Sequence, residues 1–155
     1  MLSRFETFTV LIAKVNRCIH RLKAEEMAEF CLKSSHVSCL YYLYKANSLT
    51  AKELCDLCGE DKANISRAVK YLENEGYLRG EAAGQKRYQI ALSLTEKGKE
   101  VGQAIAVKID RILLLASEGL DEESRKVFYQ SLALICGNLE RICAEYGEEK
   151  KKEEN

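Results

Sequence analysis

Over most of the chain, apolar residues recur at the three- and four-residue steps of amphipathic helices. The spacing predicts a first helix over residues 3–29, with a stripe made of Phe5, Phe8, Ile12, Val15, Ile19 and Leu22. Two more long helices are predicted over residues 96–118 and 121–146, the second with Asp121 as its N-cap. These three stripes hold more apolar surface than a domain of this size needs to cover its own core.

Shorter helices are predicted between the long ones. One runs through "HVSCLYYLYKA", and both Ser34 and Ser35 are candidate N-caps for it. The next begins in "LTAKELCDLCG" with a capping box, in which Thr50 and Glu53 exchange hydrogen bonds. Gly59 follows it at the position where a left-handed residue commonly ends a helix.

A further short helix, over residues 61–75, has two contrasting faces and Asp61 as its cap. Its apolar side consists of Ile65, Val69 and Leu72, with Ala68 at the margin. Its opposite side carries Ala63, Ser66, Arg67, Lys70 and Asn74. Acidic residues occur only in the last turn, at Glu73 and Glu75, so a negatively charged partner could lie against the middle of this face. For an isolated helix, a solvated surface would be the alternative interpretation.

After Gly76 the hydrophobic period changes from helical to alternating. In the segment 87–94 the apolar positions are Tyr88, Ile90, Leu92 and Leu94. This alternation is typical of a strand with one buried face. The segment "YLRGE" before it is a candidate partner strand, and "AAGQK" is the turn between them. Two closely spaced helices are therefore followed directly by a β-hairpin.

Composition narrows the class of protein. Lysine plus arginine and aspartate plus glutamate number 24 each, so the formal net charge is zero. A nucleic-acid ligand would then need a local basic patch, because overall charge supplies no attraction. The seven cysteines are irregularly spaced in helical segments, which indicates reduced thiols. With no signal-peptide pattern and no apolar run of ~18 residues, we expect a cytoplasmic protein outside the membrane.

A helix-turn-helix followed by a hairpin is a winged helix-turn-helix. In this arrangement the chain resembles the multiple antibiotic resistance regulator (MarR) family of transcription factors. The resemblance is carried by "LTAKELCDLCGEDKANISRAVKYLENEGYL" and by "LSLTEKGKEVG", in which "LTEKG" directly follows the second wing strand. It implies a mainly α fold with a small β-hairpin wing, in a single domain over residues 1–146 with its winged lobe at about 34–95. The charged segment 147–155 is expected to be a disordered tail.

The resemblance also implies a partner and a mode of action. The helices at 3–29, 96–118 and 121–146 would interlock in a homodimer. Such a dimer reads a pseudo-palindromic operator in double-stranded DNA, with half-sites about one helical turn apart. The implied function is a repressor that leaves DNA when a small-molecule or oxidant effector binds or reacts.

The same resemblance makes residues 61–75 the recognition helix. Arg67 is the candidate for base readout, because arginine pairs bidentately with guanine. Asn64, Ser66 and Lys70 are candidates for phosphate or mixed contacts, and the small Ala63 allows close approach.

The predicted wing departs from the family pattern. Many members carry an Asp-x-Arg motif at the tip, whereas this chain has "GQKRYQ". The resemblance therefore carries over only a basic wing, with Lys86 and Arg87 as its DNA contacts. His36, at the start of a helix, either faces a phosphate or caps that helix, and the sequence leaves both alternatives open.

The cysteines suggest metal or redox chemistry at first sight. "CDLC" at residues 55–58 lacks the second pair that a structural zinc site needs, so we expect no metal. Cys58 is expected in the core beside Leu54 and Leu57, with Cys55 at its edge. For Cys18, Cys136 and Cys143, buried packing is favoured over a reactive thiol.

The chain has no phosphate-binding glycine loop, nucleophile elbow or His–Glu metal motif, so we expect neither an enzyme nor a bound cofactor. The alternative to a DNA-binding regulator is a dimeric winged-helix protein-interaction module without specific DNA binding. Net neutrality and the atypical wing keep that alternative open.

Overall fold

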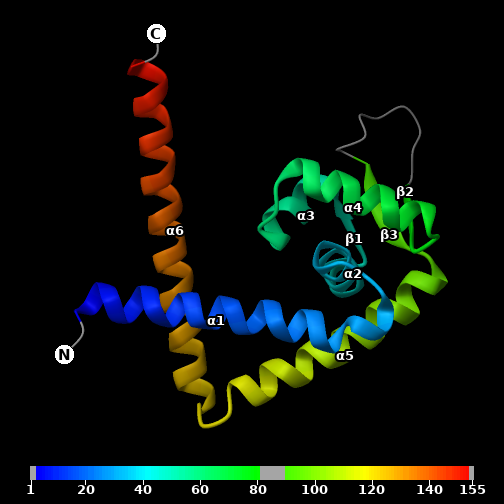
Figure 1. Cartoon of the computed structure of the whole chain (residues 1–155), viewed down its shortest axis with the longest axis horizontal. Helices are drawn as coiled ribbons and strands as arrows, with labels where there is room; N and C mark the ends of the chain where they lie inside the picture. The colour runs from blue at the N-terminus through cyan, green and yellow to red at the C-terminus, as the bar shows by residue number, and fades with distance from the viewer. Residues whose placement is uncertain (1–2, 81–89, 154–155) are drawn as a thin grey trace. The chain divides into compact units, whose positions relative to one another are not determined.

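The computed structural model describes residues 3–80 and 90–153 of the chain, and Figure 1 shows its elements. The helices are α1 (Arg4–Glu26), α2 (Ser34–Ala46), α3 (Ala51–Cys58), α4 (Lys62–Asn74), α5 (Glu96–Ala116) and α6 (Glu122–Glu153). A 3-10 turn, η1, covers Ala28–Phe30. The strands are β1 (Ser48–Thr50), β2 (Leu78–Gly80) and β3 (Ala91–Leu94). The chain divides into two units, Met1–Arg111 and Ile112–Asn155, which are described separately.

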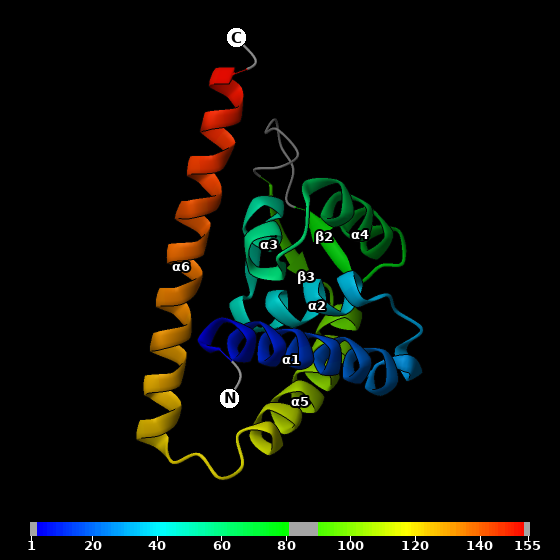
Figure 2. The same ribbon diagram turned by 60° about the vertical axis from the view of Figure 1, so that its left-hand side comes forward.

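Helix α2 is the centre of the first unit. Figure 2 shows α3, α4 and the small sheet beside it, and each of them contacts it. Every residue from Ser35 to Leu40 is buried, as is Leu43. The core is completed from other elements by Met27, Leu54, Ile65, Leu72, Leu78, Leu92 and Ile105. Burial of these side chains is the main source of stability for the lobe that carries the candidate site.

The sheet has the order β1-β3-β2, and both pairs are antiparallel. Leu78 lies opposite Leu94, as expected for the two arms of the predicted hairpin. The predicted turn at 82–86 lies outside the described residues. Strand β1 was not predicted, and it pairs Leu49 with Leu92 on the other side of β3. The base of the wing is therefore attached to the segment between α2 and α3.

Three predicted helix ends, at the start of α3, the end of α3 and the start of α4, are confirmed. The Glu53 amide donates to Thr50 Oγ1 at 3.2 Å, and the Thr50 amide donates to the Glu53 carboxylate at 2.7 Å. Gly59 has φ +63°, the left-handed conformation expected of it. Asp61 accepts a hydrogen bond from the Asn64 amide at 2.7 Å and so caps α4. These caps set where each helix of the helix-turn-helix begins and ends.

Three predicted boundaries were wrong. The first helix ends at Glu26 instead of residue 29, because Met27 is buried in the core and the chain continues as η1. The N-cap of α2 is Lys33, one residue before Ser34. The last helix continues to Glu153, although residues 147–155 were expected to be disordered. The segment's glutamates and lysines are strong helix formers, which favours this continuation.

Long apolar stripes are left uncovered in the separate units. In the first unit, Ile12, Val15, Ile19 and Leu22 of α1 remain exposed. In the second unit, exposed apolar side chains include Leu113, Phe128, Ile135, Leu139 and Ile142. Isolated exposed apolar residues are common, but contiguous stripes of this length mark interaction surfaces. Among the described residues, no helix combines the length and the apolar character needed to span a membrane.

Candidate nucleic-acid interface

Helix α4 has the two faces that its sequence predicts. Ile65, Ala68, Val69 and Leu72 are buried against the core, and each has no more than 6% of its surface exposed. The side chains at the opposite face, Ala63, Ser66, Arg67 and Lys70, are exposed. The helix is therefore fixed by one face and presents the other to solvent.

The exposed face is positively charged in its middle. Arg67 and Lys70 make no hydrogen bond or ion pair with any residue in 3–80 or 90–153. The acidic residue of this helix, Glu73, lies in its last turn. Two cations and a hydroxyl are thus presented together with a small residue, Ala63, which lets another surface approach closely.

Asn64 differs from its neighbours. It is partly buried, and its side-chain amide donates to the Glu60 carboxylate at 2.6 Å. This bond holds the side chain against the turn between α3 and α4. A contact between Asn64 and DNA would have to use the remaining hydrogen-bonding capacity of the amide.

His36 lies inside the lobe, with 6% of its surface exposed. Its Nδ1 accepts a hydrogen bond from the Lys33 amide at 3.3 Å, and its ring stacks on the ring of Tyr71. Burial, together with the charge of Lys33, lowers the pKa of His36 below its ordinary value. The geometry is that of the helix-capping alternative, so we leave His36 out of the proposed interface.

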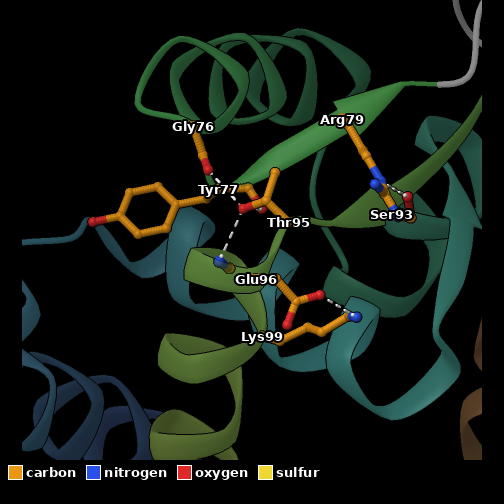
Figure 3. A network of polar contacts seen from close by, with 8 residues as sticks. Gly76, Tyr77, Arg79, Ser93, Thr95, Glu96 and Lys99 are labelled. Atoms are coloured by element: carbon orange, nitrogen blue, oxygen red, sulfur yellow. Dashed lines mark hydrogen bonds and ion pairs between the residues drawn. The ribbon is translucent and has the colours of Figure 1, made fainter.

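The wing is described at its base only. Lys86 and Arg87, the predicted wing contacts, lie outside the described residues. On β2, Arg79 is exposed, and its Nε donates to Ser93 Oγ on β3 at 3.3 Å (Figure 3). Arg79 was not among the residues predicted to contact DNA. The alternation of Leu78 and Arg79 in "YLRGE" was the signal that could have identified it, because it directs the arginine outward.

The "LTEKG" motif forms the joint between the wing, α4 and α5 (Figure 3). Thr95 Oγ1 donates to the Gly76 carbonyl at 2.7 Å and accepts from the Gly98 amide at 3.1 Å. The Thr95 amide donates to the Tyr77 carbonyl at 3.0 Å. A Cβ on Gly98 would overlap that same carbonyl oxygen, so only glycine fits there. One threonine thus caps α5 and holds the chain that leaves α4.

Comparisons with known proteins agree with this geometry. Residues 32–87 match the model of the MarR family. The chain is 21% identical to the uncharacterized HTH-type transcriptional regulator YwaE of Bacillus subtilis over 131 residues, covering 84% of this chain and 77% of that protein. Over residues 32–87, which include α2, α3 and α4, the chain is thus similar to the MarR family of regulators.

Solved structures show the same fold. NMB1585, a MarR family regulator from Neisseria meningitidis, superposes with a TM-score of 0.81 at 17% identity, covering 93% of this chain and 99% of that one. The S. aureus MepR–DNA complex superposes with a TM-score of 0.72 at 16% identity, covering 85% of this chain and 97% of that one. This chain therefore shares the fold of these regulators, a winged helix-turn-helix with long flanking helices.

The cysteines of the chain lie in two kinds of environment. Cys55 and Cys58 pack against the core, as expected, but Leu57 beside them is 46% exposed and not buried. Leu54, three residues earlier on α3, is fully buried, so the buried face of this helix centres on Leu54 and leaves Leu57 at its margin. A hydrogen bond with Cys58 and burial raise the pKa of the Cys39 thiol, which keeps it protonated.

The other predicted cysteine positions were wrong. Cys18, Cys136 and Cys143 are exposed on α1 and α6, whereas buried packing was expected. They lie on the same helices that leave their apolar stripes uncovered in the single chain. Among the described residues, no group of three or more His, Cys, Asp or Glu side chains is placed to hold a metal ion.

A cavity of about 860 Å³ lies between α3, α4 and the wing strands. Its lining is mainly apolar and includes Ile65, Val69 and Leu92. Lys52 and Ser66 also line it, and Ser66 belongs to the exposed face of α4. A molecule in this cavity would therefore contact the proposed recognition helix directly.

Proposed function

We propose that the protein is a homodimeric regulator of transcription that binds a specific sequence in double-stranded DNA through α4. The observation that supports this most strongly is the helix itself. Its apolar face is buried in the core, and its exposed middle carries Ser66, Arg67 and Lys70 without an acidic residue. A rigidly held, basic helix followed by a hairpin is the arrangement with which winged helices enter the major groove.

The side chains of α4 divide into two roles. Arg67 reads a base, because its guanidinium pairs bidentately with guanine O6 and N7. Ser66 and Lys70 bind phosphate or make mixed contacts, and Ala63 lets the helix approach the groove closely. Asn64 adds a contact only to the extent that its bond to Glu60 leaves its amide available. Lys86 and Arg87 supply the positive charge of the wing.

The homodimer is supported by the uncovered apolar stripes of α1, α5 and α6. A second copy of the chain would cover these stripes, because a two-fold interface uses the same surface of both copies. Two recognition helices would then read a pseudo-palindrome with half-sites about one helical turn apart.

Regulation follows from the same arrangement. The proposed protein is a repressor, and an effector releases it by favouring a dimer in which the two recognition helices are wrongly spaced. The cavity between α3, α4 and the wing gives a small molecule a place beside Ser66. An oxidant would act instead on the exposed thiols of α1 and α6.

A dimeric protein-interaction module is the second candidate function. It is favoured by the zero net charge, which supplies no general attraction to DNA, and by the absence of the Asp-x-Arg motif from the wing. This alternative predicts that the exposed face of α4 tolerates substitution of Arg67.

The deciding experiment selects preferred sites from a random duplex library, including the DNA upstream of the protein's own gene. Affinity for the selected duplex is then measured by fluorescence anisotropy for wild type, Arg67→Ala and Arg17→Ala. Arg17 lies on α1 and provides the same change of charge far along the chain from α4. We expect Arg67→Ala to lose about tenfold or more in preference for the selected site, and Arg17→Ala to bind like wild type. A wild-type protein that prefers no sequence would contradict the proposal and favour the interaction module.

A further inference from the structure

We propose that Lys97 is a positioning residue for DNA recognition, which fastens the C-terminal end of α4 to the first turn of α5. This inference rests on the proposed function, in which α4 reads DNA. In this proposal the lysine of "LTEKG" acts through contacts within the protein and does not itself bind DNA.

The contacts of Lys97 all lie at the end of α4. Its Nζ donates to the carbonyl of Glu75 at 2.7 Å, and Glu75 is the C-cap of the helix. The same ammonium lies 4.1 Å from the centroid of the Tyr77 ring. The last carbonyls of a helix have no partner within it and carry its negative dipole end, so a cation there is favourable. The face of a tyrosine ring attracts the same charge.

Neighbouring hydrogen bonds make this end of α4 a fixed joint. Consecutive carbonyls are all taken by the segment that starts α5: Glu75 by Lys97, Gly76 by the Thr95 hydroxyl and Tyr77 by the Thr95 amide. Gly98 lets the backbones approach to this distance. The joint is therefore made of three consecutive carbonyl acceptors on one side and of Thr95, Lys97 and Gly98, all from one motif, on the other.

The joint matters because α4 and α5 have different tasks in the proposed dimer. Helix α5 is continuous from Glu96 to Ala116 and contributes to the uncovered apolar surface, while α4 carries Arg67. The direction in which Arg67 points relative to α5 thus depends on how firmly α4 is held at its end. Two recognition helices must reach their half-sites together, so a loosened joint reduces specific binding more than general attraction to DNA.

Lys99 provides a matched control within the same helix. It is exposed, and its Nζ pairs with Glu96 at 2.7 Å and not with α4. Lys97→Met and Lys99→Met remove the same charge from positions two residues apart. A lysine that binds DNA phosphate and a lysine that positions α4 differ in their salt dependence, since each phosphate contact adds about 0.9 to the slope of log K against log salt.

The experiment uses the full-length dimer and the duplex selected with the wild-type protein. Affinity for this duplex and for a scrambled one is measured by fluorescence anisotropy over a series of salt concentrations. We expect Lys97→Met to weaken binding to the selected duplex about tenfold relative to Lys99→Met, with equal salt slopes and equal binding to the scrambled duplex. Lys97→Arg, which keeps the cation and its donors, should restore most of the affinity.

The outcomes separate the two proposals. If the wild-type protein prefers no duplex, the proposed function fails. If the wild-type protein has a preference and Lys97→Met matches Lys99→Met, the positioning role is overturned while the function stands. A salt slope lower by about one in Lys97→Met alone would also overturn it, because Lys97 would then be a phosphate contact. Circular dichroism is used to check that each variant is folded. If Lys97→Met does not fold, Lys97→Gln takes its place, because glutamine keeps a hydrogen-bond donor and removes the charge.

Discussion

The imidazole ring of His36, in α2, stacks face to face on the phenol ring of Tyr71, in α4, with centroids 4.3 Å apart and planes 7° from parallel. The pair joins the first turn of α2 to α4 one helical turn after Arg67. His36 also accepts the Lys33 amide, so a single side chain caps α2 and supports α4. Neutral imidazole is required for that acceptor role, because protonation turns Nδ1 into a donor.

The stability of the lobe should therefore fall in mild acid. Burial lowers the pKa of His36 in the folded protein, so below the ordinary value of about 6.5 the unfolded chain takes up a proton more readily than the folded one. Stability is complete above that pH and is lost as the pH falls towards the lower pKa of the folded state. Urea unfolding at fixed protein concentration, at pH 7.5 and 5.5, measures the loss. In His36→Gln the pH-dependent loss should be smaller, although the missing ring stack should cost about 1 kcal/mol at both pH values. An equal loss in both proteins would contradict the assignment.

Substitution of Gly98 tests the joint from the side of the backbone. A methyl group at this position would overlap the Tyr77 carbonyl oxygen, and the backbone has to shift to relieve it. We expect Gly98→Ala to destabilise the protein by about 2–3 kcal/mol, although alanine is otherwise the better helix former. Gln103→Ala, at an exposed position of the same helix, should stay within about 0.5 kcal/mol of wild type. Thermal unfolding at one protein concentration compares the three, and a Gly98→Ala protein as stable as the control would refute the close contact.

The dimer proposal is tested on α1. Ile19 is 46% exposed in the single chain and lies in the apolar stripe of this helix. A carboxylate placed there would have to lose its bound water when two copies associate. In sedimentation velocity, Ile19→Glu should therefore move from the sedimentation coefficient of a dimer to that of a monomer. Arg17→Glu puts the same carboxylate on the opposite side of α1 and should leave the protein dimeric. If Ile19→Glu remained a dimer at micromolar concentration, the partner surface would not include this stripe.

Lys70 should behave as a phosphate contact. Lys70→Met is expected to weaken binding to selected and scrambled duplexes alike and to lower the salt slope by about one. Lys99→Met, which removes an equal charge from α5, serves as the reference. Anisotropy titrations over about 50 to 300 mM salt, where such contacts are measurable, give the slope of log K against log salt for each variant. Lys70 would instead be a base-reading residue if only the selected duplex lost affinity.

Much of the lobe could be predicted from local patterns. The apolar and polar faces of α4 follow from helical periodicity, and the Thr50–Glu53 capping box follows from side chains three residues apart. In both cases the physical cause lies within one turn of chain. The family resemblance added the homodimer and the DNA ligand, and these remain proposals.

Features that depend on distant residues were missed. Strand β1 consists of three residues, and it pairs with β3, more than 40 positions along the chain. The bond between Lys97 and Glu75 spans 22 residues, and nothing near either residue signals the other. Leu57 was placed in the core by its hydrophobicity, but the direction of a helix as short as α3 depends on its packing against α2 and α4.

Six consecutive residues of α2, namely Ser35, His36, Val37, Ser38, Cys39 and Leu40, are all buried, so the helix has no solvent-facing side over this stretch. If every position of the protein were substituted in turn, the number of tolerated residues would therefore not vary with a period of three to four residues in this stretch. In α4 it would vary with that period. Because each residue of this stretch has its own set of neighbours, exchanges would be accepted only between side chains of similar size and polarity. Sequence drift in this protein should accordingly be slowest in the helix around which the lobe is packed.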